Sequence, residues 1–192
     1  EFNNWYFGWH AGMTFNTGPP ISLPTSPIAQ STLVSGFSIS DSAGNFLFCS
    51  EGKKIYDKFL NVTPNGAGLL GGGSDCQSAI ALQLPGNSQI YYIVTAGHDP
   101  GPFGPVIGLY YSVFNMDLNG GLGDIVPGMK NIALPYGDSV VDQLTATRHA
   151  NNRDYWIVVL NHAKTNNYLA YRLTASGIDP TPVISPANFK TK

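Results

Sequence analysis

The sequence repeats one pattern of strands and turns at a fixed distance. Residues 91–94 (Tyr-Tyr-Ile-Val) match residues 155–158 (Tyr-Trp-Ile-Val) when the chain is shifted by 64 positions. Each segment is preceded by an apolar run and a polar turn, and each is followed by another aromatic run, a turn and a short last run. Repetition at a fixed period is typical of propellers and solenoids, in which similar units stack in series. The sequence therefore predicts a recurring unit of four strands.

Turn signals separate the apolar runs throughout the chain. The clearest turns are expected at 41–44, 85–88 and 150–153, where Gly, Asn, Asp, Pro and Ser gather. The runs on both sides are rich in β-branched and aromatic residues, which favour strands. Residues 16–31 are expected to form a loop, because Pro cannot donate to a strand ladder and four prolines lie there. The chain is predicted to be all-β.

We expect one propeller-like region over residues 1–192, with units at 4–72, 73–138 and 139–192. Each unit would be a four-stranded antiparallel sheet that hides its apolar face against a neighbour. About three blades cannot close a ring of typically about four to eight. The chain would then be a piece of something longer, or its open edges would pair with a partner. A β-sandwich is the alternative, because all hairpins resemble one another.

The composition favours an extracellular location and excludes several partners. Charged residues make up 11% of the chain, against about 25% in ordinary soluble proteins. The net charge is −2 and basic residues form no block, so neither nucleic acid nor an anionic membrane surface is an expected partner. No apolar run is long enough for a transmembrane helix. The first residues are typical of a mature terminus after signal removal.

Two cysteines, Cys49 and Cys76, are present. A disulfide between them fits an oxidising compartment. Two buried thiols fit the sequence equally well.

Several short motifs, in a fixed order, resemble those of a bacterial family. They occupy residues 4–8, 39–48, 64–71, 77–80, 118–124, 144–146 and 149–156. Together they resemble the N-terminal propeller-like region of large Bacteroidetes-type proteins exported by the type IX secretion system, including gliding-motility adhesin relatives. The resemblance covers nearly the whole chain. It implies a secreted or cell-surface bacterial protein, a longer parent chain and no defined catalytic chemistry, and a disulfide between Cys49 and Cys76 would be a departure from the family.

The sequence contains no catalytic motif. A Gly-x-Ser-x-Gly turn and a His-Glu-x-x-His pair are both absent. His98 and Asp99, in a Gly- and Pro-rich stretch expected to be a loop, are the best single candidates for a site. The alternative is a loop histidine hydrogen-bonded to its neighbours. We expect a protein that is not an enzyme.

One stretch is a candidate for calcium. Asp117, Asn119 and Asp124 supply oxygen ligands among glycines, as hard cations require. The bidentate Glu of an EF-hand loop is absent, so a plain turn is the alternative. No other cofactor is expected.

Aromatic residues often come in adjacent pairs. Neighbours on a strand face opposite ways, so one ring of each pair should lie in the core and one outside. Tyr92, Tyr111 and Trp156 are therefore candidate binding residues, since an exposed ring suits sugar stacking or protein contact. The alternative is that adjacent sheets cover both rings.

Two tripeptides, centred on Ser42 and Ser139, have the Asp-Ser-apolar form of O-glycan acceptors in Bacteroidetes-type bacteria. Three functions fit these observations. The first is a non-catalytic extracellular module for adhesion or binding to a glycan or a protein. The second is a structural segment of a multimeric surface assembly or fibre, and the third is a carbohydrate-active enzyme or a lectin.

Overall fold

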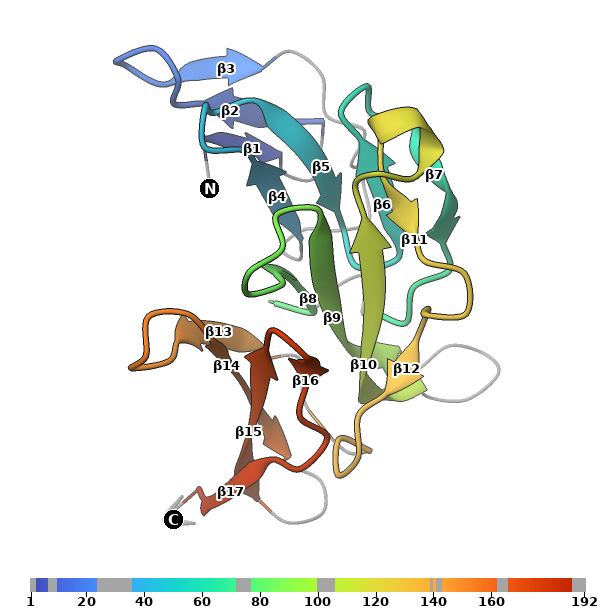
Figure 1. Ribbon diagram of the computed structural model, residues 1–192, viewed down its shortest axis with the longest axis vertical. Coiled ribbons are helices and arrows are strands. Elements are labelled where there is room, and N and C mark those ends of the chain that lie inside the picture. The colour runs from blue at the N-terminus through green and yellow to red at the C-terminus, as the bar shows by residue number, and fades with distance from the viewer. Residues whose placement is uncertain are drawn as a thin grey trace.

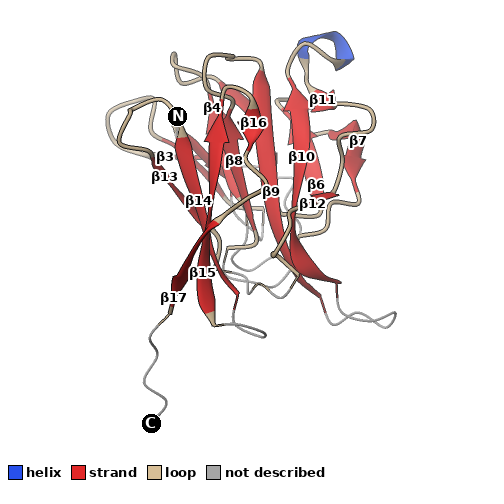
Figure 2. Ribbon diagram, turned by 60° about the horizontal axis from the view of Figure 1, so that its bottom comes forward, coloured by secondary structure: helices blue, strands red, loops and turns tan. Residues whose placement is uncertain are grey.

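The computed structural model describes residues 3–6, 10–23, 36–71, 77–99, 106–138, 140, 143–161 and 166–187. Within these residues the chain folds into four open antiparallel sheets and a 3-10 turn at Asn119–Gly121. Figure 2 shows that strands provide almost all the regular structure. The predicted all-β class is confirmed. In this part of the chain no helix has the length and apolar character to cross a bilayer.

The four sheets follow one another along the chain, from the first at the top of Figure 1 to the fourth at the bottom. The first sheet contains β1 (Asn4–Tyr6), β2 (Gly12–Thr14) and β3 (Ile21–Leu23). The second contains β4 (Phe37–Ser40), β5 (Phe46–Ser50), β6 (Lys54–Asp57) and β7 (Val62–Ala67). The third contains β8 (Ala79–Gln83), β9 (Ile90–Asp99), β10 (Val106–Asn115), β11 (Asp124–Ile125) and β12 (Ile132–Ala133). The fourth contains β13 (Thr145–Arg148), β14 (Tyr155–Asn161), β15 (Asn167–Thr174), β16 (Gly177–Ile178) and β17 (Val183–Pro186).

The third and fourth sheets have the same topology. In each, four consecutive strands form a meander, and a fifth strand returns to pair with the third strand beside the short fourth one. The repeated segments 91–94 and 155–158 lie at equivalent places, in the second strand of each sheet. Residues 4–72 contain two separate sheets, whereas one sheet was expected there. The segment 16–31 includes β3, so its predicted loop contains a short strand.

Side-chain hydrogen bonds shape the turns at the strand ends. Asp41 Oδ1 accepts the backbone N–H of Ala43 at 2.9 Å and of Asn45 at 2.8 Å. Gly44 takes a φ of 86° in this turn, a conformation that favours glycine. Asp57 caps the β6–β7 turn in the same way, through the N–H groups of two residues that follow it. This local bonding is why Asp is preferred in turns.

The third sheet buries both of its faces. Alternate residues of β9 point to opposite sides, and Tyr91 and Ile93 face the second sheet whereas Val94 and Ala96 face the fourth. The contact with the second sheet is an apolar cluster of Ile39, Phe48, Ile55, Leu69, Tyr91, Ile93, Phe114, Met116 and Ile125. The contact with the fourth is a cluster of Ile80, Val94, Ala96, Leu109, Leu134, Val140, Leu144, Ile157, Val159, Leu169, Tyr171 and Leu173.

The second sheet also buries both faces. Phe48 points to the third sheet, and the next residue, Cys49, packs with Tyr56 and the ring of Tyr6 on the side of the first sheet. Polar contacts reinforce this side: the Asn4 side chain donates to Ser40 Oγ at 3.0 Å and to the Gly44 carbonyl at 2.8 Å. The four sheets therefore pack face to face in series.

The Phe48 ring is the centre of the contact between the second and third sheets. It is fully buried, lies 4.6 Å from the Phe114 ring and meets the Tyr91 ring edge-on at 5.0 Å. We predict that Phe48→Ala lowers the free energy of unfolding by about 3–5 kcal/mol, through lost burial and an unfilled cavity. Urea denaturation measures this change. Phe59→Ala is the control, because Phe59 is 65% exposed; equal effects from the two substitutions would contradict the packing.

Candidate binding groove

The first strands of the four sheets lie next to one another. β1 contacts β4, and β4 contacts β8. Gln77, just before β8, forms a parallel bridge with Gln143, just before β13, and the Gln77 carbonyl accepts the Leu144 N–H at 3.3 Å. A cavity of about 580 Å³ runs along these strands and takes its lining from all four sheets. The first strand of each sheet therefore borders a common cavity.

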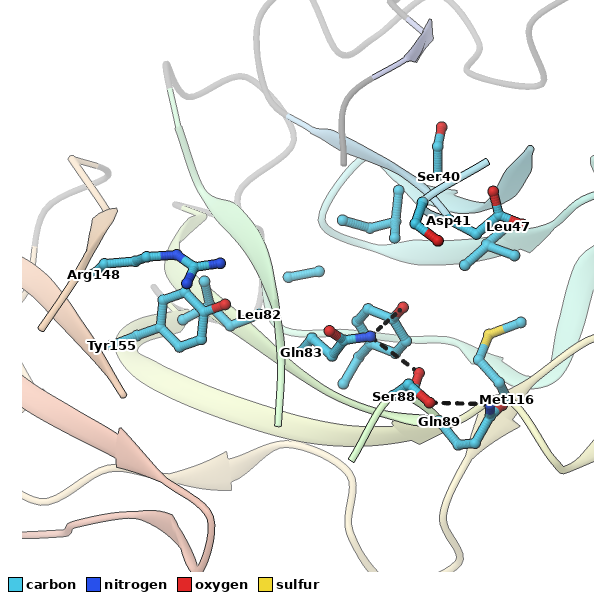
Figure 3. Close-up of a pocket in the computed structure, with 14 residues that line it drawn as sticks. Ser40, Asp41, Leu47, Leu82, Gln83, Ser88, Gln89, Met116, Arg148 and Tyr155 are labelled. Carbon is cyan, nitrogen blue, oxygen red and sulfur yellow. Dashed lines mark hydrogen bonds between the residues drawn. The ribbon is translucent and has the colours of Figure 1, made fainter. Parts of the chain in front are cut away.

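A second cavity, of about 960 Å³, lies where the first strands end in turns (Figure 3). It shares Ile39, Ala81 and Leu82 with the first cavity, so the two cavities adjoin and together form one groove. We call this the groove. Figure 3 shows Arg148 and Tyr155 together at one side and Asp41 at the other, with Gln83 between them.

The floor of the groove carries a fixed amide. Gln83 is the last residue of β8, and its Nε2 donates to the Tyr91 hydroxyl at 3.2 Å and to the Ser88 carbonyl at 3.1 Å. Burial raises the pKa of Tyr91, so its hydroxyl stays protonated at neutral pH. These bonds hold the amide in one orientation before any ligand arrives.

One wall carries a positive charge stacked on a ring. The Arg148 guanidinium lies 5.7 Å from the centre of the Tyr155 ring, and Nη1 donates to the Asn152 carbonyl at 3.2 Å. A polar hollow of about 420 Å³ adjoins this wall and extends to Arg153 and Asn87. Guanidinium and amide groups at fixed positions are suited to hydroxyl and carboxylate oxygens.

The groove contains one acidic side chain among its described lining residues, Asp41. Its oxygens are taken by the side chain of Asn45 and by the turn's own N–H groups. The Asn45 amide is the main reason that the pKa of Asp41 lies below its ordinary value. Cleavage of a glycosidic bond usually needs two carboxylates, one of which has to be protonated.

Two of the predicted aromatic residues lie between sheets. The rings of Tyr92 and Tyr111 stack with centroids 5.6 Å apart and pack against the cluster between the third and fourth sheets. Tyr91 and Tyr92 face opposite ways, as predicted, but both sides of this sheet are covered. Tyr92 also reaches β16, because a Cβ added at Gly177 would lie 2.7 Å from its hydroxyl. These two tyrosines serve packing and lie outside the groove lining.

The other predicted binding residues lie elsewhere in the fold. Trp156 is half-buried on the face of the fourth sheet that points away from the third, and its ring lies 5.3 Å from that of His149. His98 and Asp99 belong to the end of β9, paired with Ile107 and Val106, so the expectation of a loop at this place is wrong. The side chains of His98 and Asp99 lie outside the described part of the structure.

The calcium candidates have separate surroundings. The Asn65 N–H and side-chain amide donate to the two oxygens of Asp124, at 2.9 and 2.7 Å. These bonds join β7 to β11 and so hold the second sheet on the third. Asp117 and Asn119 are exposed in and beside the 3-10 turn. Among the residues that the structure describes, no three His, Cys, Asp or Glu side chains are grouped as metal ligands would be.

Of the four remaining predicted residues, the structure describes Cys49 and Ser42. Cys49 is a buried free thiol, and burial together with the nearby carboxylates raises its pKa, so it is a poor nucleophile. Cys76 and Ser139 lie outside the described residues. Ser42 is exposed in the Asp41 turn and lines the groove.

Sequence reasoning missed the residues that form the groove. Gln83 and Arg148 are the last residues of β8 and β13, and Tyr155 is the first residue of β14. These residues flank the turn of the first hairpin in the third and fourth sheets. The repeat could have predicted that they lie close together, because stacking of similar sheets brings equivalent positions to the same side.

Comparison with known proteins gives no relative for this chain. No family model, curated protein or solved structure matches it. The function is therefore inferred from the geometry of the groove.

A buried ion pair supports the wall of the groove. Asp154 is fully buried and accepts hydrogen bonds from Arg172 at 2.6 Å, Arg153 at 2.9 Å and Asn151 at 2.9 Å. The Arg153 guanidinium is the largest of the causes that hold the pKa of Asp154 well below its ordinary value. This carboxylate fixes the turn between Arg148 and Tyr155.

We predict that Asp154→Asn destabilises the fold at neutral pH. Because the pKa of Asp154 is lower in the folded than in the unfolded protein, its ionised carboxylate stabilises the fold at every pH above its unfolded-state pKa of about 3.9. That contribution to stability is lost as the pH falls toward the folded-state pKa. The difference between wild type and Asp154→Asn should therefore shrink progressively below about pH 4. Thermal melts across pH measure it, with Asp179→Asn in an exposed turn as the control. A difference that is constant with pH would contradict the ion pair.

Proposed function

We propose that the chain is a non-catalytic extracellular module that binds a glycan in the groove formed by its stacked sheets. The observation that carries this proposal is the groove itself, in which Gln83, Tyr91, Tyr155 and Arg148 come together from two sheets. The low charge of the chain and the resemblance described above support an extracellular setting at a bacterial surface.

The proposed architecture is an arc of a propeller-like array. In a propeller, blades pack face to face and radiate from a common centre. The serial packing of the sheets and the adjacency of β1, β4, β8 and β13 support this arrangement. A two-layer sandwich would bury one face of each sheet, whereas the second and third sheets bury both.

The chemistry of the groove favours a sugar over a flat protein surface. Sugars present hydroxyl groups that pair with amides and guanidinium groups, and their C–H faces stack on aromatic rings. Gln83, Gln89 and Arg148 supply the polar groups, and the Tyr155 ring supplies an apolar surface. The two adjoining cavities of the groove extend along several strands, which suits an extended oligosaccharide.

A glycan array followed by calorimetry tests this proposal. We predict that Arg148→Ala and Tyr155→Ala each weaken binding of the best oligosaccharide by about tenfold or more, equivalent to about 1.4 kcal/mol. Phe59→Ala should leave binding unchanged, since Phe59 is exposed and lies outside the groove lining. Binding that is insensitive to both groove variants would overturn the site. Hydrolysis of the glycan by the wild type would overturn the non-catalytic assignment.

A structural role in a larger assembly is the second candidate. It is favoured by a different observation, the apolar side chains on the outer face of the fourth sheet. This role is compatible with ligand binding, because Thr145 alone, among the described residues of that face, also lines the groove.

A further inference from the structure

The face of the fourth sheet that points away from the third is largely apolar and partly exposed to solvent. Along β14 and β15 the residues that face the third sheet are buried, except for the half-buried Tyr155 and Asn167, and most of those between them are half-buried or exposed. The strand pairings place Val183 beside Ala170, and Ser185 beside Tyr168, on this outer face. Its members are Thr145, Thr147, Trp156, Val158, Leu160, Tyr168, Ala170, Arg172, Val183 and Ser185. We call this set the outer face.

The internal repeat shows what covers a face of this kind. A shift of 64 positions places Trp156 on Tyr92 and Val158 on Val94. In the third sheet these equivalent positions are covered by the fourth sheet, and Val94 is fully buried. Phe48 of the second sheet is covered by the third sheet in the same way. In each earlier sheet the matching face is covered by the next sheet in the series.

The outer face carries little charge. Arg172 is its one charged member, and Arg172 is bonded to the buried Asp154. Tyr168 is 41% exposed and Val183 is 55% exposed. Apolar surface of this kind gains free energy when it is removed from water.

The other end of the series presents a matching surface. In the first sheet Tyr6 faces the second sheet, so Trp5 and its strand partner Met13 face away from it. Trp5 also borders the first cavity of the groove. Trp5 is 44% exposed and Phe15 is 39% exposed, and their rings lie 5.1 Å apart. These residues bear no charge, so they can lie against the outer face without an electrostatic penalty.

We propose that the outer face binds the Trp5 side of the first sheet in a second copy of the chain. The contact is head to tail, and it continues the same sheet-on-sheet interface that already occurs three times within one chain. Two copies bring eight sheets together, which is within the range of about four to eight blades in closed propellers. A head-to-tail contact of this kind either closes a ring or continues as a filament.

Two variants with complementary defects test this contact. Tyr168→Lys with Val183→Lys places charge on the outer face, and Trp5→Lys places charge on the first sheet. All three positions are exposed, so the fold is expected to survive, and circular dichroism with a thermal melt checks that it does. Phe59→Lys is the control for an added charge at an exposed aromatic position.

Light scattering after size exclusion, from micromolar to millimolar protein, gives the mass. The wild type and Phe59→Lys should exceed the 20.6 kDa of one chain as concentration rises, and each face variant alone should stay at that mass. An equimolar mixture of the two face variants should form a dimer and nothing larger. The intact outer face of the Trp5→Lys variant binds the intact first sheet of the other variant, and the two surfaces that remain are both altered. A wild type that remains a single chain throughout would overturn the proposal. A mixture that stays monomeric, or a Trp5→Lys variant that still self-associates, would overturn the head-to-tail contact.

Discussion

Contact between apolar sheet faces is the interaction on which the rest of this structure depends. A sheet has two faces, and strand alternation sends neighbouring side chains to opposite sides. The second and third sheets carry apolar residues on both faces, so each has to lie between two neighbours. β9 illustrates this, since Tyr91 meets the Phe48 ring of the second sheet and Val94 packs in the cluster shared with the fourth sheet. Serial stacking follows from the composition of the strands.

The groove is a consequence of that stacking. Because the sheets are similar and lie face to face, their first strands come together along one side, and equivalent strand ends meet at one place. Gln83 and Arg148 occupy such ends in different sheets. Each is held locally: Gln83 by the Tyr91 hydroxyl, and Arg148 by the turn that Asp154 fixes. Rigid sheets thus position a polar site that no single sheet contains.

The sequence predicted local structure and the repeat, because these depend on nearby residues. The turn at Asp41 and the equivalence of 91–94 with 155–158 are visible in the chain itself. The environment of Tyr92 could not be predicted in this way, because its burial depends on a sheet more than fifty residues later. β3 was missed since Pro-rich sequence conceals a three-residue strand. The groove residues were missed because their proximity comes from stacking, which periodicity alone does not specify.

Nuclear Overhauser contacts in solution test the serial arrangement most directly. With aromatic and methyl groups labelled, Tyr91 and Ile93 should show contacts to Phe48, and their neighbour Val94 should show contacts to Ile157. Both sets observed in one sample would show that one strand separates two different partner sheets. If Ile93 and Val94 contacted the same sheet, or if either side of β9 showed contacts to solvent alone, the stacked arrangement would be contradicted.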